Sequence, residues 1–246
     1  MHRSRKIAGA VLVFALCATA AAADRVLPVG DALCAEMKAA HVLNPGAPVG
    51  CERLRLVEFD YVGFDGKAHA GGQVVVMDAV AGRVLRIFQA LKEKNFPIAK
   101  AKPMDAYGGN DDASMADDNT SGFNDRDVPG AGRKSLHAYG VAIDLNPVEN
   151  PFVTRSGATF TFDPPAGAGH FNRIIHRPGK PERRGEAEEV VDIFARNGFT
   201  QWGGNWDDPI DYQHFDVGRA LAEELTKLPP DEAKAKFEQS IFQPSP

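Results

Sequence analysis

The chain has 246 residues, with 28 Lys and Arg against 33 Asp and Glu and a formal net charge of −5 at pH 7. Hydrophobic residues make up 43% of the chain and charged residues 25%, which is typical of a globular protein and excludes a largely membrane-embedded or disordered one. The negative balance argues against nonspecific nucleic-acid binding, because such binding depends on Lys and Arg neutralising phosphates.

The first 23 residues have the pattern of a secretory signal peptide. Residues 1–6 are basic, residues 7–23 carry no charge, and three alanines before Asp24 form a small-residue cleavage site. The apolar stretch is slightly shorter than most spanning helices, and an uncleaved N-terminal anchor is the alternative. We expect a periplasmic or secreted bacterial protein with no other spanning segment. Cleavage would remove three basic residues and take the net charge from −5 to −8.

Two cysteines, Cys34 and Cys51, remain after cleavage in a predicted N-terminal lead-in over residues 24–51. An even number of cysteines in an exported chain indicates a disulfide, whose closure would contribute about 3 kcal/mol in the chain-entropy model. Two separate buried thiols are the alternative. Within the lead-in, residues 31–40 fit one short helix.

A hairpin and a helix are predicted next along the chain. Apolar and polar residues alternate over 52–62, which indicates a half-buried strand, and residues 73–77 form a second strand. Residues 78–95 place their apolar side chains on one helical face, with Asp78 as the expected N-cap. Residues 103–134 are polar and weakly periodic, and we interpret their acidic run as a solvated loop.

The second half of the chain predicts an α+β fold. A short apolar strand covers 141–145, residues 147–182 are irregular, and residues 186–197 form a helix. Residues 211–216 form a turn leading to a last core strand, and two terminal helices follow in a tail over 218–246. Helices and strands mixed without regular βαβ alternation favour a single domain over 52–217, with an antiparallel sheet and packed helices.

Two histidines lie close in sequence to carboxylates: His137 precedes Asp144 by seven residues, and His214 follows Asp211 by three. Two imidazoles and one carboxylate can supply three zinc ligands and leave the fourth tetrahedral position for water. A spare carboxylate could then accept a proton from that water, which is the arrangement of metal-assisted hydrolysis. From spacing alone, a surface ion pair and a satisfied core histidine remain an alternative.

Longer stretches resemble, in order, the zinc D-alanyl-D-alanine carboxypeptidase and L-alanyl-D-glutamate endopeptidase family. These stretches are FDGKAHAGGQVVV (64–76), FPIAKAKPMDAYGGNDDASM (96–115), NTSGFNDR (119–126), SLHAYGVAIDLNPVENPF (135–152) and GFTQWGGNWDDPIDYQHFD (198–216). The resemblance extends over residues 52–217 and is closest to bacterial exported proteins and phage endolysins. It implies the fold that this family shares with hedgehog-type signalling domains.

The resemblance also implies site roles. It implies one Zn²⁺ ion with His137, Asp144 and His214 as ligands, and Asp211 as the general base that activates the water. Arg126 resembles the arginine that contacts the substrate carbonyl or carboxylate and stabilises the oxyanion, a task that suits its fixed charged fork.

Three further positions bear on substrate binding. Ser135 resembles a substrate-contacting or ligand-supporting residue. Trp202 is a candidate wall of the substrate cleft, with buried packing as the alternative. The family often has Cys immediately before this arginine, whereas this chain has Asp125.

The expected function is hydrolysis of peptidoglycan stem peptides by an exported, monomeric zinc metallopeptidase. The bond is either L-Ala–D-Glu, cut by an endopeptidase, or D-Ala–D-Ala, cut by a carboxypeptidase. A catalytically inert zinc-containing wall-binding module of the same fold is the alternative. A metal-dependent nuclease is disfavoured by the mature charge and the lack of a basic patch.

Overall fold

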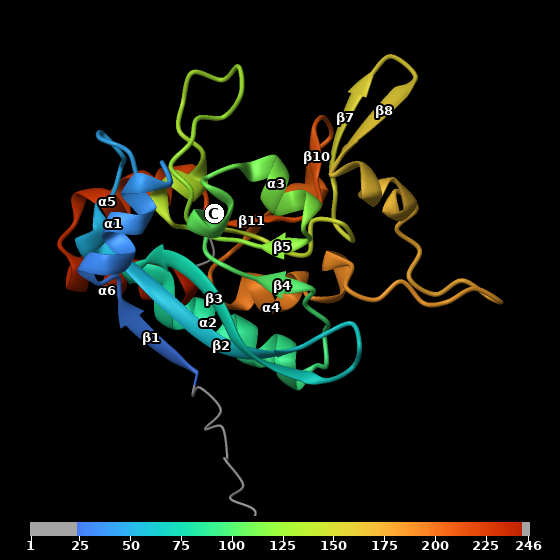
Figure 1. Ribbon diagram of the computed structural model, residues 1–246, viewed down its shortest axis with the longest axis horizontal. Coiled ribbons are helices and arrows are strands. Elements are labelled where there is room, and N and C mark those ends of the chain that lie inside the picture. The colour runs from blue at the N-terminus through green and yellow to red at the C-terminus, as the bar shows by residue number, and fades with distance from the viewer. Residues whose placement is uncertain (1–23, 243–246) are drawn as a thin grey trace, which may run out of the picture.

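A computed structural model describes residues 24–242, so the predicted signal peptide lies outside the described residues. The helices are α1 (Asp31–Ala39), α2 (Asp78–Glu93), α3 (Asp111–Ala116), α4 (Val191–Arg196), α5 (Arg219–Lys227) and α6 (Pro230–Phe242). The strands are β1 (Arg25–Pro28), β2 (Leu54–Val62), β3 (Ala68–Met77), β4 (Lys100–Ala101), β5 (Asn119–Thr120), β6 (Ala142–Asp144), β7 (Phe152–Ser156), β8 (Thr159–Asp163), β9 (Gln201–Trp202), β10 (Ile210–Asp211) and β11 (His214–Asp216). This mixture of helices and antiparallel sheets confirms the predicted α+β class (Figure 1).

The strands form several small sheets rather than the one sheet that the sequence predicted. Three antiparallel sheets have the strand orders β1-β2-β3, β10-β7-β8 and β6-β11-β9, and β4 pairs with β5 in parallel. Short strands of two or three residues, such as β9 and β10, carry too little alternation to be recognised in the sequence.

The long hairpin of β2 and β3 packs against α2 through apolar side chains. Val80, Val84 and Leu91 of α2 are fully buried, as the period of the helix predicts. The ring of Phe88 stacks on Phe59 of β2, with ring centroids 3.7 Å apart. Asp78 begins α2 but does not cap it with its side chain.

Asp78 instead accepts hydrogen bonds from Arg53 in the short 3₁₀ helix before β2. The Nε and Nη2 atoms of Arg53 lie 2.8 and 3.1 Å from the two carboxylate oxygens. The expected N-cap is therefore wrong, because a paired buried guanidinium satisfies this carboxylate better than one backbone amide.

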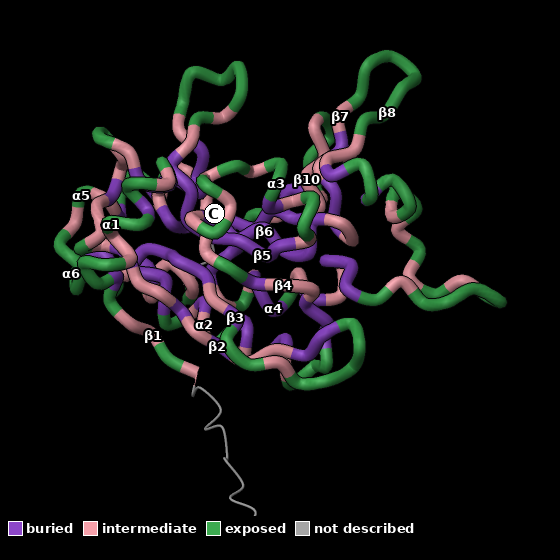
Figure 2. Tube along the Cα trace, viewed as in Figure 1, coloured by how far each residue is buried: buried purple, intermediate pink, exposed green. Residues whose placement is uncertain are grey.

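A second aromatic cluster fixes the strand that leads into the site. Phe215 of β11 stacks on Phe194 of α4 with ring centroids 3.8 Å apart, and Phe199 packs edge-on against Phe194. All three side chains are almost completely buried. The buried chain is concentrated around β5 and β6 in the middle of the molecule, whereas the hairpin tips are exposed (Figure 2). Burying several aromatic rings beside β11 stabilises its position, at roughly 1.5–3 kcal/mol for each ring removed from water.

Strand β1 pairs the N-terminal lead-in with the first sheet, and a disulfide closes the lead-in. Strand β1 is an edge strand of the first sheet, with Val26 opposite Val57 of β2. Cys34 of α1 forms a disulfide with Cys51, which begins the turn into β2.

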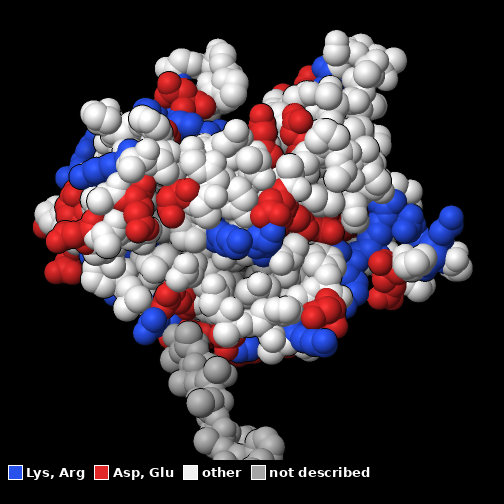
Figure 3. Space-filling model, viewed as in Figure 1, with Lys and Arg blue, Asp and Glu red and all other residues white. Residues whose placement is uncertain are grey.

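Residues 147–185, which we call the projecting arm, extend from the molecule beside β10. The sequence predicted an irregular stretch here, but the arm contains the hairpin of β7 and β8, with Val153 opposite Phe162. Lys and Arg side chains gather on its outer loop, at the right of Figure 3. Within residues 24–242, the structure contains no helix that is both long and apolar enough to cross a membrane.

Candidate metal centre

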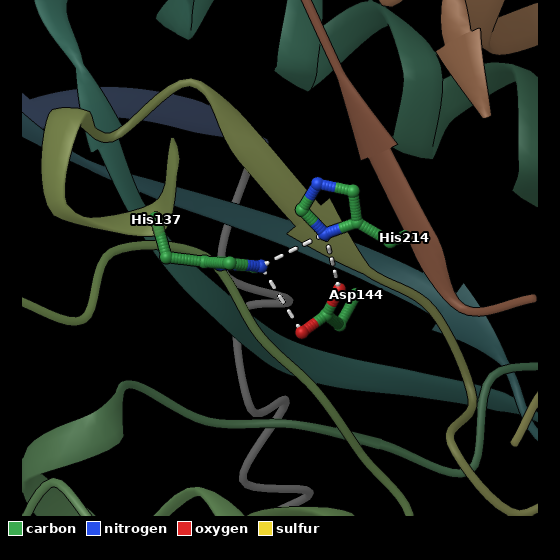
Figure 4. A group of neighbouring side chains, drawn as sticks. All are labelled: His137, Asp144 and His214. Carbon is green, nitrogen blue, oxygen red and sulfur yellow. Dashed lines mark hydrogen bonds and ion pairs between the residues drawn. The ribbon is translucent and has the colours of Figure 1, made fainter. Parts of the chain in front are cut away.

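Three side chains from separate elements converge on one point. His137 comes from the 3₁₀ helix Leu136–Tyr139, Asp144 ends β6, and His214 begins β11 (Figure 4). His137 Nε2 lies 3.2 Å from His214 Nδ1 and 3.1 Å from one oxygen of Asp144, whose other oxygen lies 3.1 Å from His214 Nδ1. The three ligand atoms lie within 4.8 Å of one another and could hold a metal ion.

Strand pairing brings Asp144 and His214 together although 70 residues separate them. They are directly opposite each other in the antiparallel register of β6 and β11, so their side chains lie on the same face of the sheet. His137 reaches the same point because its 3₁₀ helix ends at Gly140, whose positive φ of 68° turns the chain back into β6.

Residues 121–126 form the backbone support of the centre. Ser121 and Asp144 exchange two backbone hydrogen bonds of 2.9 and 3.0 Å, and the carbonyl of Gly122 lies 2.6 Å from His137 Nδ1. A Cβ atom at Gly122 would lie 2.4 Å from the carbonyl oxygen of Val75 in β3. Only glycine therefore allows this segment to lie against β3 and still hold His137.

The outer nitrogen of each histidine is bonded away from the centre. His137 Nδ1 donates to the carbonyl of Gly122, and His214 Nε2 donates to Asp216 at 3.1 Å. Each imidazole then presents the lone pair of its other nitrogen to the carboxylate of Asp144. The two ring nitrogens and the carboxylate oxygens of Asp144 lie about 3 Å from one another. Their lone pairs and negative charge repel at this distance unless a positive charge lies among them.

The pKa shifts of Asp144 and His214 indicate the same preference for positive charge. Burial opposes ionisation of both Asp144 and His214, yet the charges and hydrogen bonds of the two histidines hold the pKa of Asp144 below its ordinary value. Hydrogen bonds to Asp144 and Asp216 raise the pKa of His214 well above its ordinary value despite burial. The donor set therefore fits a cation, and two imidazoles with one carboxylate are ligands that zinc accepts.

Asp211 lies beside the centre on β10 and is not one of the three convergent ligands. Burial raises its pKa to about 7, which the positive charge of His214 partly offsets. Its buried Oδ1 atom has no hydrogen-bond partner among the described residues. A buried carboxyl group that titrates near neutral pH, next to a cation site, is suited to accept and return a proton.

Arg126 points toward the same region. Its Nη2 atom lies 2.8 Å from an oxygen of Asp111 at the start of α3, and its positive charge lowers the pKa of Asp211. Burial raises the pKa of Asp111, which Arg126 partly offsets. The sequence placed Asp111 in a solvated loop, and this was wrong because α3 forms there and turns the side chain toward Arg126.

Ser135 supports the ligand loop. Its hydroxyl accepts a hydrogen bond of 3.3 Å from the backbone of His137, and its own amide donates to the carbonyl of Arg126. The serine thereby links the segment of the arginine to the segment of the first ligand.

Trp202 packs within the fold beside the centre. Its ring stacks on Phe215, and its indole nitrogen donates to the carbonyl of Tyr212 at 2.9 Å. These contacts correspond to the packing alternative for Trp202. Trp206 is more exposed than Trp202, at 39%. Its ring centroid lies 5.5 Å from that of His214, so Trp206 lies at the solvent-exposed edge of the centre.

Comparison with known proteins identifies one family. Residues 129–217 match the D-alanyl-D-alanine carboxypeptidase family. The matched segment contains the three convergent residues and Asp211, and it confirms the predicted resemblance to these peptidases. It covers less than half of the chain and begins after Arg126, whereas the sequence predicted a resemblance over 52–217. Searches of curated proteins and of solved structures found no match.

The match supports a hydrolase that acts on peptide bonds. The matched residues include the cluster of His137, Asp144 and His214, which could hold a metal ion.

Two contributors to the centre were missed from the sequence. The sequence leaves open whether Asp216 orients His214 or faces solvent, and in the structure the residue is only 3% exposed and bonded to the ring. Gly122 has no sequence signal of its own, because its constraint is the approach of β3 from elsewhere in the chain.

Proposed function

We propose that the chain is an exported zinc metallopeptidase that hydrolyses peptide bonds in peptidoglycan stem peptides. The scissile bond is either D-Ala–D-Ala or L-Ala–D-Glu. The observation that carries the proposal is the convergence of His137, Asp144 and His214 with their outer partners already bonded, beside a carboxyl group of raised pKa.

The three convergent residues would hold the zinc ion. When bound there, zinc supplies a Lewis acid and lowers the pKa of a coordinated water to about 7. Asp216 and the carbonyl of Gly122 keep the two imidazoles in the tautomers that face inward.

Asp211 moves the proton in the proposed reaction. Its carboxylate accepts a proton from the attacking water, and the protonated carboxyl then donates that proton to the leaving amine. The pKa of about 7 favours both steps, because a group that titrates near the working pH can accept and release a proton. A bound cation would shift this equilibrium toward the carboxylate, which is the form that the first step requires.

Arg126 stabilises the negative charge that develops on the substrate carbonyl oxygen, or holds a terminal carboxylate. Its side chain is 29% exposed, so part of it remains accessible while Nη2 contacts Asp111. Ser135 aligns the backbone between Arg126 and His137.

The family description supports a cell-wall peptide as substrate. The signal-like residues 1–23 support export to the compartment that contains the wall. The negative charge of the chain favours peptides over nucleic acids.

The test is hydrolysis of defined stem peptides by the purified mature protein, followed by mass spectrometry. We expect one specific cleavage, loss of activity with a chelator, and recovery on addition of zinc. Release of free D-Ala identifies the carboxypeptidase, and a new product with N-terminal D-Glu identifies the endopeptidase. A zinc-loaded protein that cleaves neither bond would contradict the proposed function.

A further inference from the structure

The N-terminal lead-in forms hydrogen bonds with the segment that carries Arg126. The lead-in lies outside the residues that match the family. The amide of Asp125 donates to the carbonyl of Val42 at 2.9 Å, and the side-chain amide of Asn44 donates to the carbonyl of Asp125 at 3.1 Å. The backbone amide of Asn44 donates to an Asp125 carboxylate oxygen at 3.2 Å. Residues 42–44 thus bind both the backbone and the side chain of Asp125.

The other carboxylate oxygen of Asp125 faces a cation. Lys134 Nζ lies 2.8 Å from it, and the side chain of Asp125 is completely buried. Lys134 directly precedes Ser135, whose amide donates to the carbonyl of Arg126. The ion pair therefore connects the two chain segments that carry Arg126 and the first metal ligand.

A buried carboxylate is costly unless it is paired and hydrogen-bonded, so this residue type has a specific reason to be here. Asp125 has no role in the proposed chemistry, because its side chain is enclosed by Asn44 and Lys134. The bonds of Asp125 fix the position of the next residue, Arg126. The guanidinium of Arg126 forms an ion pair with Asp111, and its charge acts on Asp211.

We propose that Asp125 is a positioning residue for Arg126, so that lead-in residues 42–44 complete the peptidase site together with Lys134. This inference rests on the proposed function. It assigns a role to the lead-in, whose fold is closed by the Cys34–Cys51 disulfide. It also gives a reason for aspartate where the resembling family often has cysteine.

The first test is Asp125→Asn, which keeps the shape of the side chain and removes its charge. We expect kcat to fall about tenfold to a hundredfold through misplacement of Arg126, with bound zinc unchanged. Asp78→Asn is the matched control, because it also removes a buried carboxylate from an ion pair, with Arg53, and should leave kcat within about twofold. An Asp125→Asn protein as active as wild type would overturn the proposal.

A double-mutant cycle separates positioning from general destabilisation. Arg126→Ala should retain a measurable rate, since losing one oxyanion donor costs about 10²–10³ in kcat. In that background Asp125→Asn should reduce kcat no further, because the group that it positions is absent. An equal loss in both backgrounds would show that Asp125 acts only on the stability of the fold, and would overturn the proposal.

Asn44→Ala provides a milder variant if Asp125→Asn fails to fold. It keeps the backbone amide bond to Asp125 and removes the side-chain bonds to the carbonyls of Asp125 and His41. We expect kcat to fall about two- to fivefold in the wild-type background and not at all with Arg126→Ala. An equal loss in the two backgrounds contradicts the proposal.

Amide hydrogen exchange gives a readout that does not need peptidase activity. Asp125→Asn should speed exchange at Asp125 and Ser135, whereas Asp78→Asn should not. If the wild-type protein cleaves no wall peptide, the proposed function fails, and this measurement still decides whether Asp125 orders the arginine segment. Unchanged exchange at both amides would overturn the positioning role.

Discussion

The metal centre and the projecting arm beside it differ in how the chain holds them. In the centre, each of the three convergent residues is held by buried hydrogen bonds from neighbouring segments: His137 by the carbonyl of Gly122, Asp144 by two backbone bonds to Ser121, and His214 by Asp216. In the arm, such buried bonds hold the part that joins the rest of the fold. Asn150 is fully buried there and bonds the carbonyls of Leu145 and Gly185, while the tip of the β7–β8 hairpin is exposed.

Asp211 lies where these two regions meet. Its strand β10 pairs with β7 of the arm, with Asp211 opposite Phe152, and three residues after Asp211 the chain enters β11 of the centre. The three candidate ligands are thus held in place by buried structure, whereas Asp211, the proposed proton-transfer group, depends on the arm as well. Substitutions in the centre should therefore lower metal affinity and the rate of hydrolysis. Substitutions in the arm should change the stability of the fold and affect the rate of hydrolysis less.

The largest effect is expected for loss of a ligand. His214→Ala should abolish both zinc binding and peptide hydrolysis, a loss greater than the roughly 10²–10⁴ that a general base alone contributes. Metal analysis and rates of product release measure it. His176→Ala is the matched control, because that side chain is 80% exposed on the arm, and it should behave like wild type. Full activity in His214→Ala would show that the three convergent residues are not required for hydrolysis.

Asp211→Asn should come next, because it removes the proton acceptor and leaves the three ligands in place. We expect kcat to fall about 10²–10⁴-fold while the protein still binds one zinc ion. Rates and metal content should be measured on the same preparation. A variant that hydrolyses at the wild-type rate would show that another group accepts the proton.

Asp216→Asn tests the outer support of the centre. It weakens the acceptor that holds His214 Nε2, and metal affinity should fall about 10–100-fold. A competition titration with a zinc chelator measures the change, with Asp192→Asn on the exposed face of α4 as the control. Equal affinity in the two variants would mean that Asp216 does not orient the ligand.

The smallest effect on rate is expected in the arm, where Glu149 makes stability depend on pH. Burial and the neighbouring Asp118 raise the pKa of Glu149 to about 9, above an ordinary value of 4.5. Between these values the folded protein keeps a proton that the unfolded chain releases, so the free energy of unfolding falls as pH rises.

Glu149→Gln removes this decline and should raise the melting temperature most at high pH. The gain over wild type should be small near pH 4.5 and grow toward pH 9, at about 2–4 °C per kcal/mol. The comparison with wild type cancels other titrating groups that the two proteins share. Parallel melting curves across this range would contradict the raised pKa, and activity at pH 7 should change less than threefold.

Much of the fold could be predicted because it depends on local patterns. The helix predicted over 78–95 is α2, and the two terminal helices predicted in the tail are α5 and α6. The β7–β8 hairpin was not predicted: Thr and Phe alternate in β8 as in a strand, but the many Pro and Gly residues of 147–182 led to an irregular stretch being predicted. Short elements such as α3 were missed because six residues carry too little periodicity to be recognised.

The sequence by itself predicted the class of the chemistry: the order of His137, Asp144, Asp211 and His214 among the stretches that resemble the family indicates metal-assisted peptide hydrolysis. Only the tertiary structure decided how these groups are held. The antiparallel register of β6 and β11 places Asp144 opposite His214, and the close approach of β3 requires Gly122 under His137. Likewise, only the fold brings Asn44 to Asp125, 81 residues away. Such constraints come from backbone groups and buried charges of distant segments, which have no periodicity or spacing in the sequence.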